Sequence, residues 1–249
     1  MRICKDIEIV GKSLGIYAKS INALVISDLH IGYEDYLNEQ GIYIPLSQYP
    51  KIKKMLEVML NDCEAETVVI VGDVKHEFGK ASKQEWLETL DLLDFLRKRV
   101  KEVHIVRGNH DNFLIPILKK KEIPLHDPIL QINDIAFVHG HKDISIEDLD
   151  CRYIILGHEH PAIALKTEMG SKKKYKCFLY GKFGEKKMIV LPSMHPLASG
   201  SEVNILPKDE LLSPILQKAD IENFYVYAVE PEQIVLKFPK IKQLNFLLQ

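Results

Sequence analysis

Five short segments of the sequence place histidine, aspartate and asparagine side chains directly after runs of valine, isoleucine and leucine. They read Asp28-Leu29-His30, Gly72-Asp73, Gly108-Asn109-His110-Asp111, His139-Gly140-His141 and Gly157-His158-Glu159-His160. Seven of the ten histidines lie in these segments or just after them, at positions 30, 76, 110, 139, 141, 158 and 160. Carboxylate, amide and imidazole donors without a thiolate suit hard or borderline divalent ions such as manganese, iron or zinc.

The spacing and number of these donors indicate more than one ion. In D-x-H and H-x-H, alternate side chains of an extended segment point to the same side, so both can reach one ion. The glycines before Asp73, Asn109 and His158 allow tight turns and close backbone approach. More than four donors is too many for one structural zinc site. We therefore predict two metal ions bridged by a carboxylate, an arrangement that serves in-line attack on phosphorus.

The elements that must position these donors alternate between strands and helices. Short runs rich in Val and Ile indicate buried strands over 23–27, 67–71, 103–106, 135–138 and 153–156. Amphipathic patterns predict helices over 47–63 and 82–99. This order predicts βαβ units and a sheet that is at least partly parallel. The loops after the strands should then converge on one crevice, where ligands bind.

The pattern changes after residue 156. Consecutive strands are predicted over 162–166, 175–180 and 187–191, and a late hairpin over 224–229 and 233–238. The segment 193–214 is rich in Ser, Pro and Gly and is predicted to be a long surface loop. We predict one α/β domain with two sheets over residues 1–249. Its motif core spans 23–192, and the loop and C-terminal strands follow over 193–249.

The composition excludes several classes of protein. Hydrophobic residues make up 46% and charged residues 27%, which excludes disorder across the whole chain. The net charge of −2 disfavours nucleic-acid binding through bulk positive charge and leaves only a local basic patch. No apolar run approaches the ~18 residues that span a membrane, and the first residues lack the apolar core of a signal peptide. The four separated cysteines are expected to be reduced, as in a cytoplasmic protein.

The five motifs together resemble the calcineurin-like metallophosphoesterases. The pattern of that family is D-x-H, then GD, then GNH(D/E), then a histidine, then GHxH, and it matches residues 28–160. The segments DLHIGYE (28–34), GDVKHEFG (72–79) and LGHEHP (156–161) look like archaeal phosphoesterases related to the SbcD-type repair nuclease. They are also similar to the bacterial DNA-ligase-associated metallophosphoesterases. The resemblance implies a single-domain, two-sheet αββα sandwich.

The resemblance also implies a role for each motif residue. The implied ligands are Asp28, His30 and His160 for one metal and Asn109, His139 and His158 for the other, with Asp73 bridging the two. Manganese is the expected metal, with iron, zinc, nickel and cobalt as alternatives. His110 would not be a ligand but would face the scissile phosphate and protonate the leaving oxygen. Asp111 would orient His110.

Some positions stay open at this stage. Many family members have an acidic or amide residue three positions after the GD aspartate, where this chain has His76, which we expect to face the substrate. Either histidine of the H-G-H segment could be the ligand. The position directly after the strand favours His139 and leaves His141 beside the ligands or facing the substrate. His195, in the segment PSMHP, is expected at the surface.

A lysine-rich segment bears on the substrate. Residues 166–187 hold eight lysines and two glutamates directly after the GHEHP motif. One interpretation is a solvated hairpin face. The other is a ridge, including Lys172, Lys173, Lys174 and Lys176, that binds a nucleic-acid backbone. Because the family resemblance favours the second, we expect a metal-dependent nuclease acting on single-stranded DNA in repair, with DNA-repair proteins as possible partners.

Two other functions are weighed against this one. A phosphodiesterase or phosphatase for small molecules, such as nucleotides or cyclic nucleotides, would have the same motifs. A non-catalytic scaffold on this fold is disfavoured because every expected ligand is present.

Overall fold

The computed structural model describes residues 1–79, 82–166 and 170–247. Its first sheet has the order β1-β2-β3-β4-β5-β6. The strands are β1 (Ile7–Ile9), β2 (Ile16–Ala18), β3 (Ala23–Ile26), β4 (Thr67–Val71), β5 (Glu102–Val106) and β6 (Leu125–His126). Strands β3 to β6 pair in parallel, whereas β1, β2 and β3 pair antiparallel. Because both faces of β3 and β4 are covered, their sequences are nearly continuous runs of Val, Ile and Leu.

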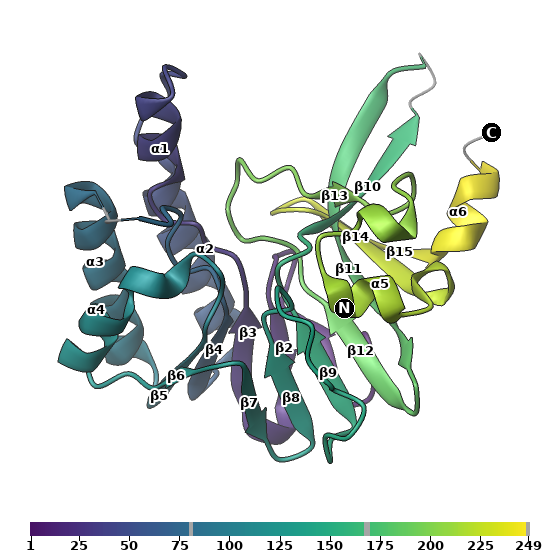
Figure 1. Cartoon of the computed structure of the whole chain (residues 1–249), viewed down its shortest axis with the longest axis horizontal. Coiled ribbons are helices and arrows are strands. Elements are labelled where there is room, and N and C mark those ends of the chain that lie inside the picture. The colour runs from purple at the N-terminus through teal and green to yellow at the C-terminus, as the bar shows by residue number, and fades with distance from the viewer. Residues whose placement is uncertain (80–81, 167–169, 248–249) are drawn as a thin grey trace.

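Helices cover the outer face of this sheet (Figure 1). They are α2 (Gln48–Cys63), α3 (Lys83–Arg99) and α4 (Ile115–Lys120), whereas α1 (Tyr33–Glu39) extends beyond the strand ends. The hydroxyl of Ser82 caps α3 by accepting a hydrogen bond from the main-chain N–H of Glu85 at 3.1 Å. The two helices predicted over 47–63 and 82–99 are therefore confirmed as the crossovers of the parallel strands.

The second sheet is formed by the later strands. Its order is β13-β10-β11-β12-β9-β8-β7, with β14 paired to β11 and β15 paired to β14. The strands are β7 (Ile129–Ile132), β8 (Ile135–Val138), β9 (Tyr153–Leu156), β10 (Pro161–Lys166), β11 (Lys172–Phe183), β12 (Lys186–Val190), β13 (Ser201–Glu202), β14 (Tyr225–Glu230) and β15 (Ile234–Lys240). Helices α5 (Pro214–Lys218) and α6 (Ile241–Leu247) lie on its outer side (Figure 1).

The two sheets face each other and share a core. Phe137 of β8 and Ile155 of β9 belong to the same buried cluster as β3, β4 and β5, whereas the alternate residues Val138, Ile154 and Leu156 belong to a cluster with α5. Successive side chains of a strand point to opposite faces, so each central strand contributes to both clusters. The fold class is the predicted α/β/β/α arrangement of two sheets with helices outside them.

Several predicted elements differ from the structure. Strand β11 is longer than the predicted 175–180, and the hairpin of β1 and β2 was not predicted. The predicted surface loop over 193–214 contains β13, and its first three residues are buried. Across the described parts of the chain, no helix has both the length and the apolar character that crossing a bilayer requires.

Candidate metal centre

The loops that follow five strands meet where the ends of the two sheets come together. His139 follows β8 in the second sheet, yet its Nδ1–H donates to the carbonyl of Val71 at the end of β4, at 3.0 Å. Likewise, the main-chain N–H of His158, after β9, donates to Oδ2 of Asp28, after β3, at 3.1 Å. The predicted convergence of the strand ends therefore occurs across both sheets.

The first set of donors consists of Asp28, His30 and His160. Their ligand atoms all lie within 4.8 Å of one another. His160 Nε2 is 3.1 Å from Asp28 Oδ1 and 3.3 Å from His30 Nε2. Two imidazole nitrogens and a buried carboxylate that face one point could hold one divalent ion.

The second set consists of Asp73, His139 and His158, again within 4.8 Å of one another. Asn109 joins this set, because its Oδ1 lies 3.1 Å from His139 Nε2. The hydrogen bond from His139 Nδ1 to the Val71 carbonyl leaves Nε2 free to bind a metal, which is how a backbone carbonyl commonly orients a ligand histidine.

Asp73 lies between the two sets. Its Oδ2 is 3.3 Å from His139 Nε2 in the second set and 3.8 Å from His30 Nε2 in the first. Its Oδ1 accepts the main-chain N–H of His110 at 2.9 Å, which fixes the carboxylate in place. The buried carboxylates and imidazoles therefore fit a pair of divalent ions that share Asp73.

The electrostatics of the centre favour the forms that bind a cation. Burial acts to raise the pKa of Asp73, but the charge and hydrogen bond of His139 outweigh it and hold the pKa far below its usual value. Burial lowers the pKa of His30, and burial together with His139 lowers the pKa of His158 to about 4. Neutral imidazoles and ionised carboxylates are the states in which these groups act as ligands.

His139 differs from the other histidines. Burial acts to lower its pKa, but the Asp73 carboxylate raises it to about 9. Without a metal, a proton on His139 therefore offsets part of the negative charge of the centre. A bound ion would take the place of that proton.

Five of the donor residues have a left-handed backbone. The φ angles of Asp28, His30, Asp73, His158 and His160 are 56°, 45°, 50°, 66° and 49°. Residues with side chains rarely adopt this region, which costs roughly 1–2 kcal/mol per residue, although Asp and His are among those that tolerate it best. Such strain clusters at functional sites, and the motif spacing gave no sign of it.

At two positions only glycine fits, because a donor residue from another loop packs against its Cα. A Cβ on Gly72, which has φ of +85°, would overlap the imidazole of His139. A Cβ on Gly108 would overlap the Asp73 carboxylate and its main-chain nitrogen. The GD and GN steps of the motifs therefore let one loop pack directly against a donor carried by another.

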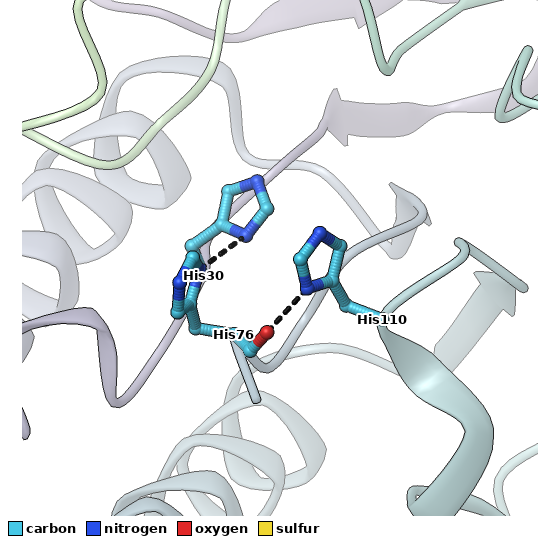
Figure 2. Close-up of side chains that lie close together, drawn as sticks. All are labelled: His30, His76 and His110. Carbon is cyan, nitrogen blue, oxygen red and sulfur yellow. Dashed lines mark hydrogen bonds between the residues drawn. The ribbon is translucent and has the colours of Figure 1, made fainter. Parts of the chain in front are cut away.

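His110 and His76 lie beside the first set (Figure 2). The Nδ1–H of His110 donates to the main-chain oxygen of His76, and its Nε2 lies 3.9 Å from Asp73 Oδ2. His76 Nδ1 is 3.2 Å from His30 Nδ1, so it can orient that ring with Nε2 toward the first set. The ring nitrogens of His30, His76 and His110 are close enough to bind an ion, but this group has no carboxylate.

Asp111 is expected to orient His110, but among the described residues no hydrogen bond joins its carboxylate to the His110 side chain. Asp111 Oδ2 accepts the main-chain N–H groups of Asp73 and Gly108, both at 2.9 Å, and Oδ1 accepts that of Val74 at 3.0 Å. Asp111 therefore ties the GD loop to the GNHD loop. The residue that orients His110 is His76, through a backbone atom that its residue type does not reveal.

Of the two histidines in the H-G-H segment, His139 lies in the second set. His141 lies beside it, with ring centroids 5.2 Å from His139 and 6.1 Å from His158. Among the described residues, no hydrogen-bond partner reaches Nδ1 of His141. This leaves His141 next to the centre, at the place expected for a group that faces the substrate.

The predicted lysine ridge is largely neutralised. Lys172 and Lys174 pair with Glu202 at 3.2 and 3.5 Å, and Lys173 pairs with Glu230 at 3.2 Å. These acidic partners come from β13 and β14, which the lysine count over 166–187 does not include.

Lys176 does not belong to the ridge at all. Its side chain is half-buried, and Nζ donates to the carbonyls of Ser193 and His195 at 2.8 and 2.5 Å. Burial lowers the pKa of this amine to about 7. Its role in the structure is to hold the loop that begins at Ser193.

His195 is fully buried, so the prediction of a surface position was wrong. Its main-chain N–H donates to the main-chain carbonyl of Asp28 at 3.3 Å, and its ring Nε2 lies 3.8 Å from Glu34 Oε2. The loop that carries it is hydrogen-bonded to Ser27 and Asp28, directly after β3, which explains the burial. The main chain of His195 therefore helps to fix Asp28 of the first set, a role that no motif indicated.

Comparisons with known proteins agree with this geometry. The calcineurin-like phosphoesterase family matches residues 21–162 of the chain. A crystal structure of the nuclease MPE from Pseudomonas putida has a TM-score of 0.64 and 18% sequence identity, covering 90% of this chain and 92% of that one. YfcE, a phosphoesterase from E. coli, has a TM-score of 0.44 and 17% identity, covering 88% of this chain and 98% of that one. No curated protein matches in sequence.

At these identities, the likeness to MPE shows a shared fold. The family match covers more than half of the chain and includes every motif that supplies a donor. This protein therefore belongs to the calcineurin-like phosphoesterases and is a metal-dependent hydrolase of phosphoric esters.

Proposed function

We propose that this protein cleaves phosphodiester bonds of single-stranded DNA with the help of two divalent ions. The observation that carries the two-ion part is the position of Asp73 Oδ2, which lies within 4 Å of one histidine nitrogen from each donor set. One carboxylate between two sets of ligands is the arrangement that in-line displacement at phosphorus uses.

The proposed ligands are divided between the two sets. Asp28, His30 and His160 would hold one ion, Asn109, His139 and His158 would hold the other, and Asp73 would contact both. When bound, the ions supply Lewis acidity and lower the pKa of the attacking water. Manganese is the proposed metal, with iron, zinc, nickel and cobalt as alternatives, because the donors include no thiolate.

His110 is the proposed general acid. Its Nδ1–H is occupied by the His76 carbonyl, so Nε2 is the atom that faces the centre. From there it can donate a hydrogen bond to a phosphate oxygen and then a proton to the leaving oxygen. His110 lies outside the two sets that contain a carboxylate, which supports a role on the substrate rather than on a metal.

Support for a nucleic-acid substrate comes from a lysine-lined cavity bordered by the loop 194–199, which none of the proposed metal ligands lines. The cavity has a volume of about 740 Å³, and Lys51, Lys54, Lys174 and Lys176 are among its lining residues. Its wall is the loop 194–199, whose start contacts the backbone of Ser27 and Asp28. Lys51 and Lys54 are exposed, and no ion pair within the described residues engages them. They therefore take the place of the neutralised ridge as candidate phosphate contacts.

The shared fold with the nuclease MPE adds support for the same substrate class. A role in DNA repair, together with repair proteins and in the cytoplasm, is part of this proposal and follows from the motif resemblance.

A parallel assay tests the proposal. The purified protein is loaded with Mn²⁺ and incubated with single-stranded DNA, duplex DNA, RNA, a chromogenic phosphodiester and a chromogenic phosphomonoester, with Asp73→Asn as the control. We expect cleavage of single-stranded DNA that the control lacks. Rapid turnover of a chromogenic phosphodiester or phosphomonoester, with no cleavage of any polynucleotide, would instead identify a phosphodiesterase or phosphatase for small molecules.

A further inference from the structure

Two aromatic side chains are exposed beside His110 and His76. Phe78 follows the GD loop and is 54% exposed, and Tyr36 of α1 is 37% exposed. Large aromatic side chains usually bury most of their surface, so exposure at the edge of a catalytic centre suggests contact with a ligand.

These aromatic rings continue a row that leads to the proposed general acid. The ring of Phe78 lies over His110, with centroids 3.7 Å apart and an angle of 31° between the planes. His76 also stacks with His110, with centroids 5.2 Å apart, and Tyr36 meets His76 edge-on at 4.9 Å. Tyr33 contacts the same His76 ring at 4.3 Å. Successive ring contacts therefore connect the exposed Tyr36, through His76 and His110, to the exposed Phe78.

The loop that carries Phe78 is held in place by buried groups. Glu85 of α3 is buried, and its Oε1 accepts the main-chain N–H groups of His76 and Glu77, both at 2.9 Å. The buried Lys75 donates to the carbonyl of Glu77. Phe78 is thus presented to solvent by a fixed backbone, which favours a preformed contact surface.

We propose that Phe78 and Tyr36 are stacking platforms for the unpaired bases of the nucleotides that flank the scissile phosphate. The inference rests on the proposed function, because it requires His110 to face that phosphate. Every base has a π-face, so stacking on aromatic rings is tolerant of sequence. A base inside a duplex has both faces covered by its neighbours. The platforms would therefore favour single-stranded over duplex DNA without discriminating between base sequences.

The competing explanation is that Phe78 only covers His110 and fixes its ring. Both explanations predict that loss of the phenyl ring slows the reaction. They differ in whether the loss depends on the bases of the substrate, because a covering ring acts on every substrate alike.

The test combines three variants with two substrates. Phe78→Leu and Tyr36→Leu remove an aromatic face and keep an apolar side chain. Tyr225→Leu is the matched control, since Tyr225 is 38% exposed and lies on β14 of the second sheet. The substrates are a single-stranded DNA oligonucleotide and a strand of the same length in which every nucleotide is abasic. The readout is kcat/KM with Mn²⁺, and melting temperatures confirm that each variant is folded.

We expect Phe78→Leu to lower kcat/KM on the base-bearing strand by about 5- to 150-fold, the range that corresponds to one stacked base. On the abasic strand the same variant should stay within about twofold of wild type. Tyr36→Leu should behave in the same way with a smaller loss, Phe78→Tyr should keep the activity, and Tyr225→Leu should change neither substrate.

An equal loss on both strands for Phe78→Leu and Tyr36→Leu would overturn the stacking inference and leave the proposed nuclease function standing. Unchanged rates on both strands would overturn it as well. If wild type cut neither strand, the proposed function itself would be wrong, and the platforms with it.

Discussion

The side chain of His110 is held by the main-chain oxygen of His76 and not by a carboxylate. A neutral carbonyl fixes the direction of the ring without the additional negative charge that a carboxylate partner would bring. The main-chain oxygen of His76 is therefore the group that orients the His110 ring. Because His110 is not one of the proposed metal ligands, mutation can separate its role from theirs.

We predict that His110→Ala retains both metals and loses most of its turnover, by roughly 10²- to 10⁴-fold, the usual contribution of a general acid. The measurements are elemental analysis of the purified variant and kcat on single-stranded DNA. His104→Ala is a suitable control, because this histidine of β5 contacts His126 and Glu102, outside both donor sets. Loss of metal from the His110 variant would mean that its role is misassigned.

Gly108→Ala should abolish metal binding at the shared carboxylate. The added Cβ would overlap Asp73, which cannot move because its Oδ1 and the surrounding N–H groups are already engaged. Gly79→Ala provides a matched control, since among the described residues its Cβ would meet only Glu77 Oε1, at an ordinary contact distance of 3.5 Å. Titration calorimetry with Mn²⁺ distinguishes the two, and tight binding by the Gly108 variant would refute the packing explanation.

Metal binding should release protons below pH 9. The Asp73 carboxylate raises the pKa of His139 to about 9 in the metal-free protein, so His139 carries a proton at neutral pH. Since a ligand imidazole must be neutral, loading the second set at pH 7.5 should release about one proton per chain. Affinity should accordingly rise with pH until His139 is neutral.

Calorimetry in buffers with different ionisation enthalpies measures this release. His141→Ala should leave the proton count unchanged, whereas His139→Ala should remove it. A heat of binding that is independent of the buffer at pH 7.5 would contradict the protonation of His139.

Lys51 and Lys54 should contribute more to DNA affinity than the lysines of β11. The double variant Lys51→Ser, Lys54→Ser should weaken binding to single-stranded DNA and reduce the slope of log affinity against log salt by roughly 1.4, about 0.7 per lost phosphate contact. Replacing Lys172 and Lys173 should change the slope less, because Glu202 and Glu230 already pair with them. Fluorescence anisotropy measures both slopes. A larger change for the Lys172 and Lys173 variant than for the Lys51 and Lys54 variant would show that the lysines of β11 are the DNA-binding surface.

The sequence was sufficient to predict which residues gather at the centre. Short runs of Val and Ile at residues 67–71 and 153–156 mark buried strands, and polar residues at their ends have to meet where parallel strands finish. That reasoning needs only local pattern and sheet geometry. The helix over 82–99 was predictable for the same reason, because its cap and its charged end are local signals.

Features that depend on distant parts of the chain could not be predicted in this way. His195 is buried because its loop packs against Ser27 and Asp28 after β3, and Lys172 of β11 is neutralised by Glu202 of β13, on the far side of β10. Asp111 uses its carboxylate on backbone N–H groups of another loop. In each case the deciding partner is tens of residues away or is a main-chain atom, and neither appears in a motif.

The central claim is that Asp73 contacts two ions at once. Anomalous diffraction from a crystal soaked in Mn²⁺, combined with elemental analysis in solution, tests it most directly. We predict two ions per chain, with one carboxylate oxygen of Asp73 shared between them or one oxygen on each, and at most one ion in Asp73→Asn. A single ion in the wild-type protein, or two ions of which Asp73 contacts only one, would contradict the two-metal assignment.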